Sequence, residues 1–257
     1  MSAITKQQKE ASGYRFKHLR TWHMLRDMRF SRKAVRPGER FPDFELITPD
    51  GETLRSSDLV GKRPLVIVTG SLTCPMTVSS LPELKRLHED LGEEVAFVLL
   101  YTREAHPGEH YPQPEAIDDK VQHARAIREI YGVDWQVAVD DLDGTLHRRL
   151  DSKPNAAYVI DESGTVVYRA LWAGASTDLN DAIRRVARGE RPRRAQVNAF
   201  VGPLINALGY IGETIDRAGR KAWQDLIIAA PPMALVGWLA GLRLRPAQKR
   251  GKAVPVS

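Results

Sequence analysis

The sequence predicts an α/β fold in which helices flank a mixed β-sheet. Two uninterrupted apolar runs, Leu65–Gly70 and Val95–Tyr101, have the composition of strands that are covered on both faces. Each run is followed by a segment whose apolar residues recur at helical spacing, which favours parallel pairing through right-handed crossovers. A hairpin pattern later in the chain adds antiparallel strands at one edge.

A basic arm and a short strand come first. Residues 1–35 carry apolar side chains at the spacing of one helix face, and Arg36-Pro37-Gly38 marks the boundary that follows. The arm residues with this spacing are Leu19, Trp22, Leu25 and Met28. Beyond the boundary, Phe41–Leu46 is predicted to be a strand and Pro49-Asp50-Gly51 a turn.

Helices and strands then alternate. The helix after the first buried strand turns four leucines to one side: Leu81, Leu84, Leu87 and Leu91. Residues 103–117 are rich in Pro and Gly and are predicted to form a loop. A helix at Asp118–Tyr131 follows, with Val121, Ile127 and Ile130 inward. The remaining elements are a strand at Trp135–Val139, a short helix at Asp143–Leu150, a hairpin of Ala157–Ile160 and Thr165–Ala170, and a helix from Ser176 or Thr177 to Val186.

These elements divide the chain into a basic helical arm at residues 1–35, an α/β domain at 36–190 and a helical extension at 191–257. The extension contains two apolar stretches, Ala195–Gly209 and Leu226–Leu242, and Pro231-Pro232 interrupts the second. Two interpretations stay open. The extension mediates homodimerisation or membrane attachment, or it forms a kinked helical pair that packs on the core.

The net charge of +6 is unevenly distributed. Residues 1–40 carry eleven Lys/Arg and three acids, a net +8, and residues 184–257 carry fourteen and four, a net +10. The centre therefore carries −12, which argues against a nucleic-acid-binding domain. Basic ends suit an anionic membrane surface, or they fold back on the acidic centre. Because the first residues lack an apolar signal segment, we expect a cytoplasmic protein that associates with membranes, if at all, peripherally through the extension.

The single cysteine limits the chemistry. It excludes an internal disulfide, a CxxC redox pair and a cysteine-rich zinc site. Nucleotide cofactors are not implied, because neither a GxGxxG motif nor a phosphate loop occurs. Metal binding is not expected either, since Pro107-Gly108 prevents the helix that would pair His106 with His110.

Cys74 is the principal candidate for chemistry. It lies between the first buried strand and the first long helix, at the edge where open α/β sheets place their sites. A helix N-terminus favours the thiolate, so we expect a lowered pKa for this thiol. Ser71 and Thr73 are expected to donate hydrogen bonds to the sulfur, and Pro75 suits the first helical turn.

The stretch Ser71-x-Thr73-Cys74-Pro75 resembles the active-site segment of the iodothyronine deiodinases, with Cys74 at the position of their selenocysteine. The stretch Leu100-Tyr101-Thr102-Arg103-Glu104-Ala105-His106 is similar to that family's tyrosine-containing strand end and Glu-Ala-His loop. The resemblance covers about residues 38–175 and implies a thioredoxin-like, redoxin-type domain.

The resemblance implies a function as well as a fold. Cys74 would be the nucleophile of a reductive dehalogenation or a related thiol reaction, with an external thiol as reductant. Tyr101, Glu104 and His106 would handle protons and position an aromatic substrate, with His106 tuned by a carboxylate. Pro154 resembles the cis-proline that faces the active cysteine in thioredoxin-like folds, and the sequence does not show which isomer is present. Sulfur replaces selenium, and Arg103 stands where the family has the first of two acids.

Two alternatives remain open. The stretch Pro37-Gly38-Glu39-Arg40-Phe41-Pro42-Asp43-Phe44 also resembles the opening of the peroxiredoxins, which implies a one-cysteine peroxidase acting on a peroxide. That family's arginine near the later strand is missing, with Asn155 close to its place. The other alternative is a non-catalytic redoxin-fold protein that binds a membrane or a partner. Trp172 is expected in the core rather than at a pocket.

Overall fold

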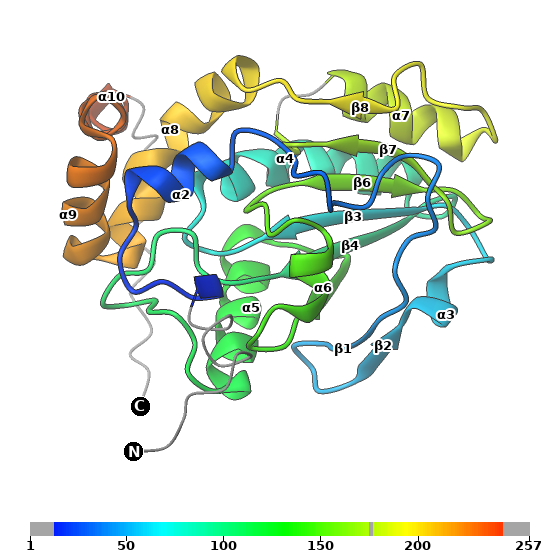
Figure 1. Ribbon diagram of the computed structural model, residues 1–257, viewed down its shortest axis with the longest axis horizontal. Helices are drawn as coiled ribbons and strands as arrows, with labels where there is room; N and C mark the ends of the chain where they lie inside the picture. Colours follow the sequence, from blue (N-terminus) through cyan, green and yellow to red (C-terminus); the bar gives the residue numbers. More distant parts are fainter. Residues whose placement is uncertain (1–12, 175–176, 244–257) are drawn as a thin grey trace.

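An eight-stranded mixed sheet organises residues 13–174 and 177–243, the part of the chain that the computed structural model describes (Figure 1). The strand order is β2-β1-β5-β4-β3-β6-β7-β8. In chain order the strands are β1 (Glu45–Ile47), β2 (Thr53–Arg55), β3 (Leu65–Gly70), β4 (Ala96–Tyr101), β5 (Gln136–Val139), β6 (Ala157–Ile160), β7 (Val166–Ala170) and β8 (Gln196–Val197).

The central strands have the arrangement of the thioredoxin-like fold. β3 pairs in parallel with β4, and β4 with β5, so the carboxyl ends of these three strands share one edge. β6 pairs antiparallel with the other side of β3, and β7 continues the hairpin. The predicted mixed α/β sheet is therefore confirmed. Its topology places the residues after β3 and those after β4 side by side.

Helices cover the sheet unequally. They are α2 (Thr21–Arg26), α3 (Ser56–Leu59), α4 (Pro75–Leu91), α5 (Ile117–Tyr131), α6 (Thr145–Arg149), α7 (Thr177–Ala187), α8 (Val201–Ala218), α9 (Arg220–Ala229) and α10 (Pro231–Arg243). Residues of α4, α5 and α7 share one hydrophobic cluster with Val66 and Leu99. The alternate residues Ile67 and Val98 face a second cluster, which contains Leu146 of α6 and residues 35–54.

The long central elements follow the prediction closely. β3 has the predicted bounds, and β4 and α5 differ from the predicted ends by one residue. Residues 103–116 contain neither helix nor strand, as the Pro- and Gly-rich composition indicates. Ile130, predicted inward on α5, is 39% exposed, whereas Lys120 and His123 of the same helix are buried. Ser176, one of two predicted caps for α7, lies outside the described residues.

The prediction was less accurate before residue 60. Among its described residues, the predicted helical arm is helical only at Gly13, Tyr14 and in the short α2, and Leu25 and Met28 are largely exposed. The strand predicted at Phe41–Leu46 begins only at Glu45, as β1. Pro42 has no N–H to donate to a neighbouring strand, and Phe41 packs on the core from a loop. β2, α3 and β8 were not predicted.

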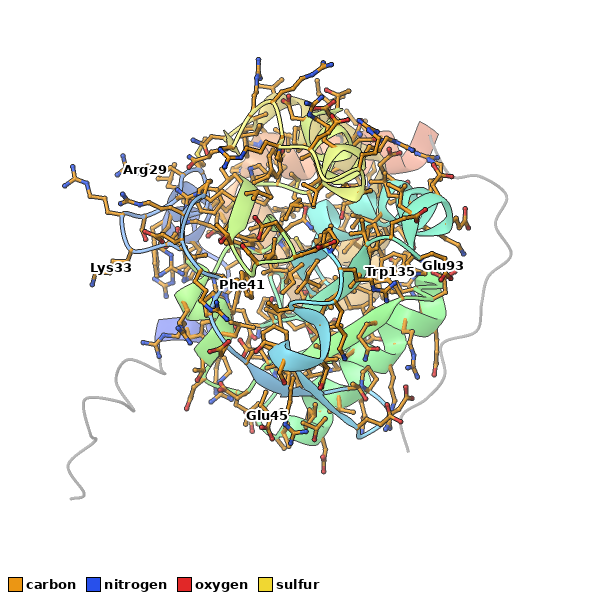
Figure 2. All side chains as sticks on the ribbon, turned by 90° about the vertical axis from the view of Figure 1, so that its right-hand side faces the viewer. Arg29, Lys33, Phe41, Glu45, Glu93 and Trp135 are labelled. Carbon is orange, nitrogen blue, oxygen red and sulfur yellow. The ribbon has the colours of Figure 1, made fainter. Side chains whose placement is uncertain are left out.

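Figure 2 views the molecule from the side opposite α9 and α10 and shows Phe41 near the middle, with Glu45 and Glu93 toward the periphery. Arg29 and Lys33 of the arm project outward in the same view and are exposed. The arm is nevertheless attached to the sheet, because Arg169 of β7 donates from Nη1 to the Val35 carbonyl oxygen at 2.7 Å.

The extension packs on the core and on the arm. α8 lies against α4, α10 lies against α8, and α9 contributes to a cluster that also contains Leu19 of the arm (Figure 1). The predicted break at Pro231-Pro232 is confirmed, since α9 ends at Ala229 and α10 begins at Pro231. Among the described helices, none is both long and apolar enough to cross a membrane. Dimerisation and membrane attachment stay predictions.

Gly108 provides a test of how the extension is attached. A Cβ atom added at Gly108 would lie 1.9 Å from the carbonyl oxygen of Ala218, at the junction of α8 and α9. Because backbone must then move, Gly108→Ala is expected to lower the free energy of unfolding by about 2–3 kcal/mol. Urea denaturation measures this. Gly13→Ala is the control, because nothing lies within 4 Å of its added Cβ atom. Equal stability of the two variants would contradict the close packing at Ala218.

Candidate active site around Cys74

Cys74 lies where β3 leads into α4. It is the N-cap residue of α4, and Pro75 occupies the first helical position, as predicted. The thiol is buried, with 2% of the residue exposed. Pairing of β3 with β4 brings the loop after Tyr101 beside it, and the thioredoxin-like topology thereby assembles the site from two chain segments.

The pKa of the Cys74 thiol is shifted in the direction opposite to the one predicted. Burial raises this pKa above its ordinary value. Hydrogen bonds from the Thr77 hydroxyl and from the backbone N–H groups of Thr77 and Met76 lower it, as a helix N-terminus should, but they only partly offset the desolvation. The resting group is therefore the thiol, and a base is needed before it can act as a nucleophile.

The hydroxyls predicted to bond the sulfur connect the two loops instead. Ser71 Oγ accepts a hydrogen bond from the Ala105 N–H at 3.2 Å. Thr73 Oγ1 accepts from the His106 N–H at 3.1 Å and donates to Glu104 Oε2 at 2.6 Å. Thr73 therefore gives its hydroxyl proton to Glu104 rather than to the sulfur, whereas the donation expected from Ser71 stays a prediction.

Glu104 is the centre of a buried hydrogen-bond network. Its Oε1 accepts from the Tyr101 hydroxyl at 2.5 Å and contacts His123 Nδ1 at 2.9 Å. Its Oε2 accepts from the backbone N–H of Thr73 at 3.2 Å in addition to the Thr73 hydroxyl. Both Tyr101 and Glu104 are completely buried. The structure thus brings Tyr101, Glu104 and Thr73 together, directly behind the loop that carries Cys74.

His123 was not identified from the sequence. It lies on α5 and faces inward with Ala124 and Ile127. The available signal was its position: His123 is four residues before Ile127, on the helix face that the apolar residues mark as buried. A histidine on a buried face must have a hydrogen-bonding partner, and Glu104 supplies it. The carboxylate predicted to tune His106 is bonded to His123.

His106 lies in a different environment from the one predicted. Its backbone is attached to Thr73, but its Nδ1 is buried without a hydrogen-bond partner. Desolvation lowers the pKa of its imidazole to about 4, so the ring is neutral at pH 7. Among the described residues, His106 and Cys74 line the same cavity, whereas Tyr101 and Glu104 lie outside its wall.

The cavity beside Cys74 has a volume of about 230 Å³. Pro75 and Pro154 line it with the cysteine, as the resemblance to thioredoxin-like folds implied, and the peptide bond before Pro154 is trans. Trp172, predicted to be a core residue, also lines it, although only 6% of the residue is exposed. Asn155 does not reach the cavity wall; its amide bonds Thr69, Ser80 and Ala173.

A second buried histidine makes stability depend on pH. His147 Nε2 donates to the Lys153 carbonyl oxygen at 2.8 Å, and its Nδ1 accepts from the Tyr14 hydroxyl at 2.7 Å. Burial lowers the pKa of His147 well below its ordinary value and that of His23 to about 4. The unfolded chain binds protons at these histidines below about pH 6.5, whereas the folded chain does not.

Acidification is therefore expected to destabilise the protein. The free energy of unfolding should fall by roughly 2–4 kcal/mol between pH 7 and pH 5. Asp27 acts in the opposite direction, because desolvation raises its pKa to about 6, but it is one group against several histidines. Urea denaturation at pH 7, 6 and 5 measures the slope. His147→Gln should flatten it and the exposed His110→Gln should not, whereas a slope of zero in the wild type would refute the prediction.

Comparisons with known proteins agree on the family resemblance. Residues 5–186 match the family model described as iodothyronine deiodinase. The thyroxine 5-deiodinase of Gallus gallus is 31% identical over 141 residues, which cover 51% of this chain and 54% of that protein. The Rattus norvegicus thyroxine 5-deiodinase is 28% identical over 148 residues, covering 53% and 48%. The chain thus spans about half the length of the curated relatives it matches.

The solved structures support the fold alone. An uncharacterized conserved protein from Geobacillus kaustophilus superposes with a TM-score of 0.53 at 20% sequence identity, covering 63% of this chain and 87% of that chain. The covered share corresponds in size to the α/β domain rather than to the whole chain. The matched family segment ends at residue 186, before β8 and α8.

Proposed function

The chain belongs to the iodothyronine deiodinase family, whose members are oxidoreductases, and from this membership we propose that it is a thiol-dependent oxidoreductase in which Cys74 removes a halogen from an aromatic substrate. One observation carries the proposal. The only cysteine of the chain lines an apolar cavity at the carboxyl end of β3, and His106 lines the same cavity. A soft nucleophile and a proton-carrying group on one cavity are the two groups that reductive dehalogenation needs.

The first step transfers the halogen to sulfur. Cys74 Sγ attacks the halogen of the aryl halide, the carbon–halogen bond breaks, and its electron pair stays on the ring carbon. The Cys74 proton then reaches that carbon. The step converts Cys74–SH and Ar–X into Cys74–S–X and Ar–H, so the arene is reduced and the sulfur oxidised by two electrons.

An external thiol completes the cycle. A first thiol attacks Cys74–S–X, releases the halide ion and a proton, and forms a mixed disulfide. A second thiol attacks that disulfide and restores Cys74–SH, leaving the oxidised disulfide of the reductant. The overall change is Ar–X plus two thiols giving Ar–H, halide, a proton and one disulfide. An external reductant is required because the chain contains no second cysteine.

His106 is assigned the proton transfer. Both partners are neutral at rest, because burial raises the pKa of the Cys74 thiol and lowers that of His106 to about 4. We assign His106 the role of taking the thiol proton as sulfur approaches the halogen and passing it to the ring carbon. The unpartnered Nδ1 supports this assignment, since no protein hydrogen bond has to be broken first.

The Glu104 network is assigned a positioning role. It connects the loop of Thr73 and Cys74 with the loop that ends at His106. The Thr73 hydroxyl donates to Glu104 Oε2 and accepts from the His106 N–H. Tyr101 and His123 anchor the carboxylate from β4 and α5. Small displacements of reacting groups cost large factors in rate, so this network supports the geometry of Cys74 and His106 without touching the substrate.

Halide release tests the proposed function. Iodinated and brominated phenols are incubated with the full chain and dithiothreitol, and free halide and dehalogenated arene are measured together. We expect both products in equal amounts, and neither when dithiothreitol is omitted and the enzyme is present only in catalytic amount. Absence of halide from all of these substrates, with the folded protein and fresh reductant, would contradict the dehalogenase proposal.

A peroxidase is the second candidate, and Arg103 is the observation that favours it. Arg103 lines the cavity of Cys74 and its Nη1 has no hydrogen-bond partner, so this residue is the candidate for the cation that the sequence lacks at Asn155. In that reaction a peroxide and two thiols give an alcohol, water and a disulfide, through a sulfenic acid on Cys74. Peroxide consumption in place of halide release would select this function. Neither activity would favour the non-catalytic alternative.

A further inference from the structure

The outer face of α10 is apolar at every exposed position that the structure describes. These positions recur at helical spacing, and none of them holds a polar or charged residue. A helix on the surface of a globular protein turns polar residues to this side, so an apolar outer face indicates a site of interaction. The exposed residues are Pro231, Pro232, Leu235, Val236, Trp238 and Leu239.

The inner face of α10 consists largely of small residues. Ala234 is buried in a cluster with Ile211 of α8, and a Cβ atom added at Gly237 would clash with the Ile211 side chain. α10 therefore packs closely on α8 and points larger apolar side chains away from the core. A helix that served only to complete the core would do the reverse, because burial of leucine or tryptophan stabilises a fold more than burial of alanine or glycine.

The exposed apolar surface continues onto α9. Ile227 and Ile228 are 54% and 77% exposed, although Leu226 beside them is buried. From Leu226 to Leu242 the sequence contains no charged residue. α9 and α10 lie at the same end of the molecule, at the left in Figure 1. The exposed residues of these two helices are named the apolar end: Ile227, Ile228, Leu235, Val236, Trp238 and Leu239.

The arm is fixed beside the apolar end. The Asp225 carboxylate of α9 accepts a hydrogen bond from the Leu19 N–H at 3.1 Å and contacts His18 Nδ1 at 3.0 Å. The Thr21 hydroxyl donates to the Ala229 carbonyl oxygen, where α9 ends, at 2.8 Å. α2 is thereby held next to the junction of α9 and α10, and Figure 1 shows the three helices together.

The arm adds exposed apolar residues and positive charge at this place. Trp22 and Leu25 of α2 are 49% and 61% exposed. The Arg26 guanidinium lies 5.2 Å from the centre of the Trp22 ring, and Arg20 and Arg29 are exposed on either side of α2. Residues 13–35 carry seven Lys or Arg and one acid, and residues 243–252 carry five Lys or Arg and no acid. Basic segments therefore flank the apolar end.

This combination identifies the partner by its chemistry. An anionic membrane surface offers phosphates to the basic residues and acyl chains to the apolar ones. A second copy of the chain would bring the same basic segments against each other in a two-fold contact, and their repulsion opposes it. Tryptophan and arginine also suit the headgroup layer, because each has an apolar body and a polar tip.

We propose that the apolar end and α2 together form a surface that binds an anionic membrane, with α10 lying in the plane of the headgroups. α10 runs for 13 residues, about 20 Å, and buries its outer face among the acyl chains. Arg26 and Arg29 contact lipid phosphates at the edge of this face. The proposal uses neither Cys74 nor its cavity, so it does not depend on the reaction proposed above.

Vesicle sedimentation with the full chain tests this surface. Sucrose-loaded vesicles of phosphatidylcholine, with and without about 30% phosphatidylglycerol, are pelleted in the presence of the protein. We expect a partition coefficient that is at least about tenfold higher on the anionic vesicles and that falls as salt is raised. Binding to neither kind of vesicle, or equal binding to both, would overturn the proposal.

A double variant tests the apolar contribution. Leu235→Ser combined with Trp238→Ser should lower the partition coefficient at least about tenfold, since both side chains leave water in the bound state. Both are exposed in the free protein, so the fold should be retained, as near-ultraviolet circular dichroism would show. Ile130→Ser is the control, because it replaces an exposed apolar residue of α5, and it should bind as the wild type does. A folded double variant with unchanged binding would refute the role of α10.

A second double variant tests the basic contribution. Arg26→Gln combined with Arg29→Gln should weaken binding to anionic vesicles severalfold and leave binding to phosphatidylcholine unchanged. Arg55→Gln combined with Lys62→Gln removes the same charge from exposed residues near β2 and α3, on another side of the molecule (Figure 1), and should have little effect. Equal losses in the two variants would show that net charge, and not this surface, attracts the protein.

Insertion and self-association are measured on the same preparations. Lipids brominated on their acyl chains should quench the tryptophan fluorescence of the bound protein, and Trp22→Phe combined with Trp238→Phe should remove most of this quenching. Quenching that the variant retains would contradict insertion of this face. A dimer in sedimentation velocity that Leu235→Ser with Trp238→Ser dissociates, in a protein that binds no vesicles, would assign the apolar end to a second copy and refute the membrane proposal.

Discussion

Replacing Cys74 with serine is expected to lower the rate of halide release by a factor of about a thousand or more while leaving the fold intact. Serine differs by one atom, and the thiol accepts hydrogen bonds from Met76, Thr77 and the Thr77 hydroxyl that an oxygen can also accept. The loss should therefore be chemical. A hydroxyl neither attacks a halogen nor forms a mixed disulfide, so both halves of the cycle stop.

The control for this variant is Ser163→Ala, in the exposed turn between β6 and β7, which should retain full activity. Halide and arene are measured under saturating dithiothreitol, with near-ultraviolet circular dichroism as the test of folding. Halide release by Cys74→Ser within tenfold of the wild type would show that another group carries the reaction.

Glu104→Gln is expected to produce the second large effect. The carboxylate meets donors at both oxygens: Tyr101 and His123 at one, and Thr73 at the other. The glutamine side chain has a single accepting oxygen. Its NH₂ group would face the donors that now bond the other carboxylate oxygen. Breaking a buried charged network of this kind should lower the free energy of unfolding by about 3–5 kcal/mol.

The catalytic consequence should be a loss of roughly a hundredfold in kcat, because the loops that carry Cys74 and His106 lose their common anchor. The KM for the phenol should change little, since Glu104 does not line the cavity. The measurement is made well below the melting temperature of the variant. Glu45→Gln, which removes an exposed partner of Arg55, is the control. A large rise in KM with unchanged kcat would contradict the positioning role.

Sequence patterns predicted the central sheet well because its signals are local. Residues 65–68 and 95–101 are apolar without interruption, and their burial on both faces follows from that composition. The short pieces β2 and β8 have no such pattern, because pairing with β1 and β7 determines them. Leu25 and Met28 were predicted to share a helix face with Leu19 but are largely exposed, whereas Leu19 packs against residues of α8 and α9 from the far end of the chain.

The site was predictable in its residue types but not in its connections. Cys74 was a candidate from its place in the chain, and Tyr101, Glu104 and His106 were candidates from the family resemblance; the topology brings the segments that carry them together. The partner of Glu104 was not predictable, because His123 comes from a helix whose rotation depends on packing. Desolvation of Cys74 likewise depends on α8 and on Trp172, which no local pattern places over the thiol. The sign of its pKa shift therefore requires the tertiary structure.

The most direct test of the account is a single turnover of the fully reduced protein without external thiol. The protein is freed of dithiothreitol, mixed with excess 4-iodophenol and analysed by mass spectrometry. We predict at most one equivalent of phenol per chain, with Cys74 oxidised as the sulfenyl iodide or the sulfenic acid that forms from it with water. Release of iodide while Cys74 remains a free thiol would contradict the claim that its sulfur takes the halogen.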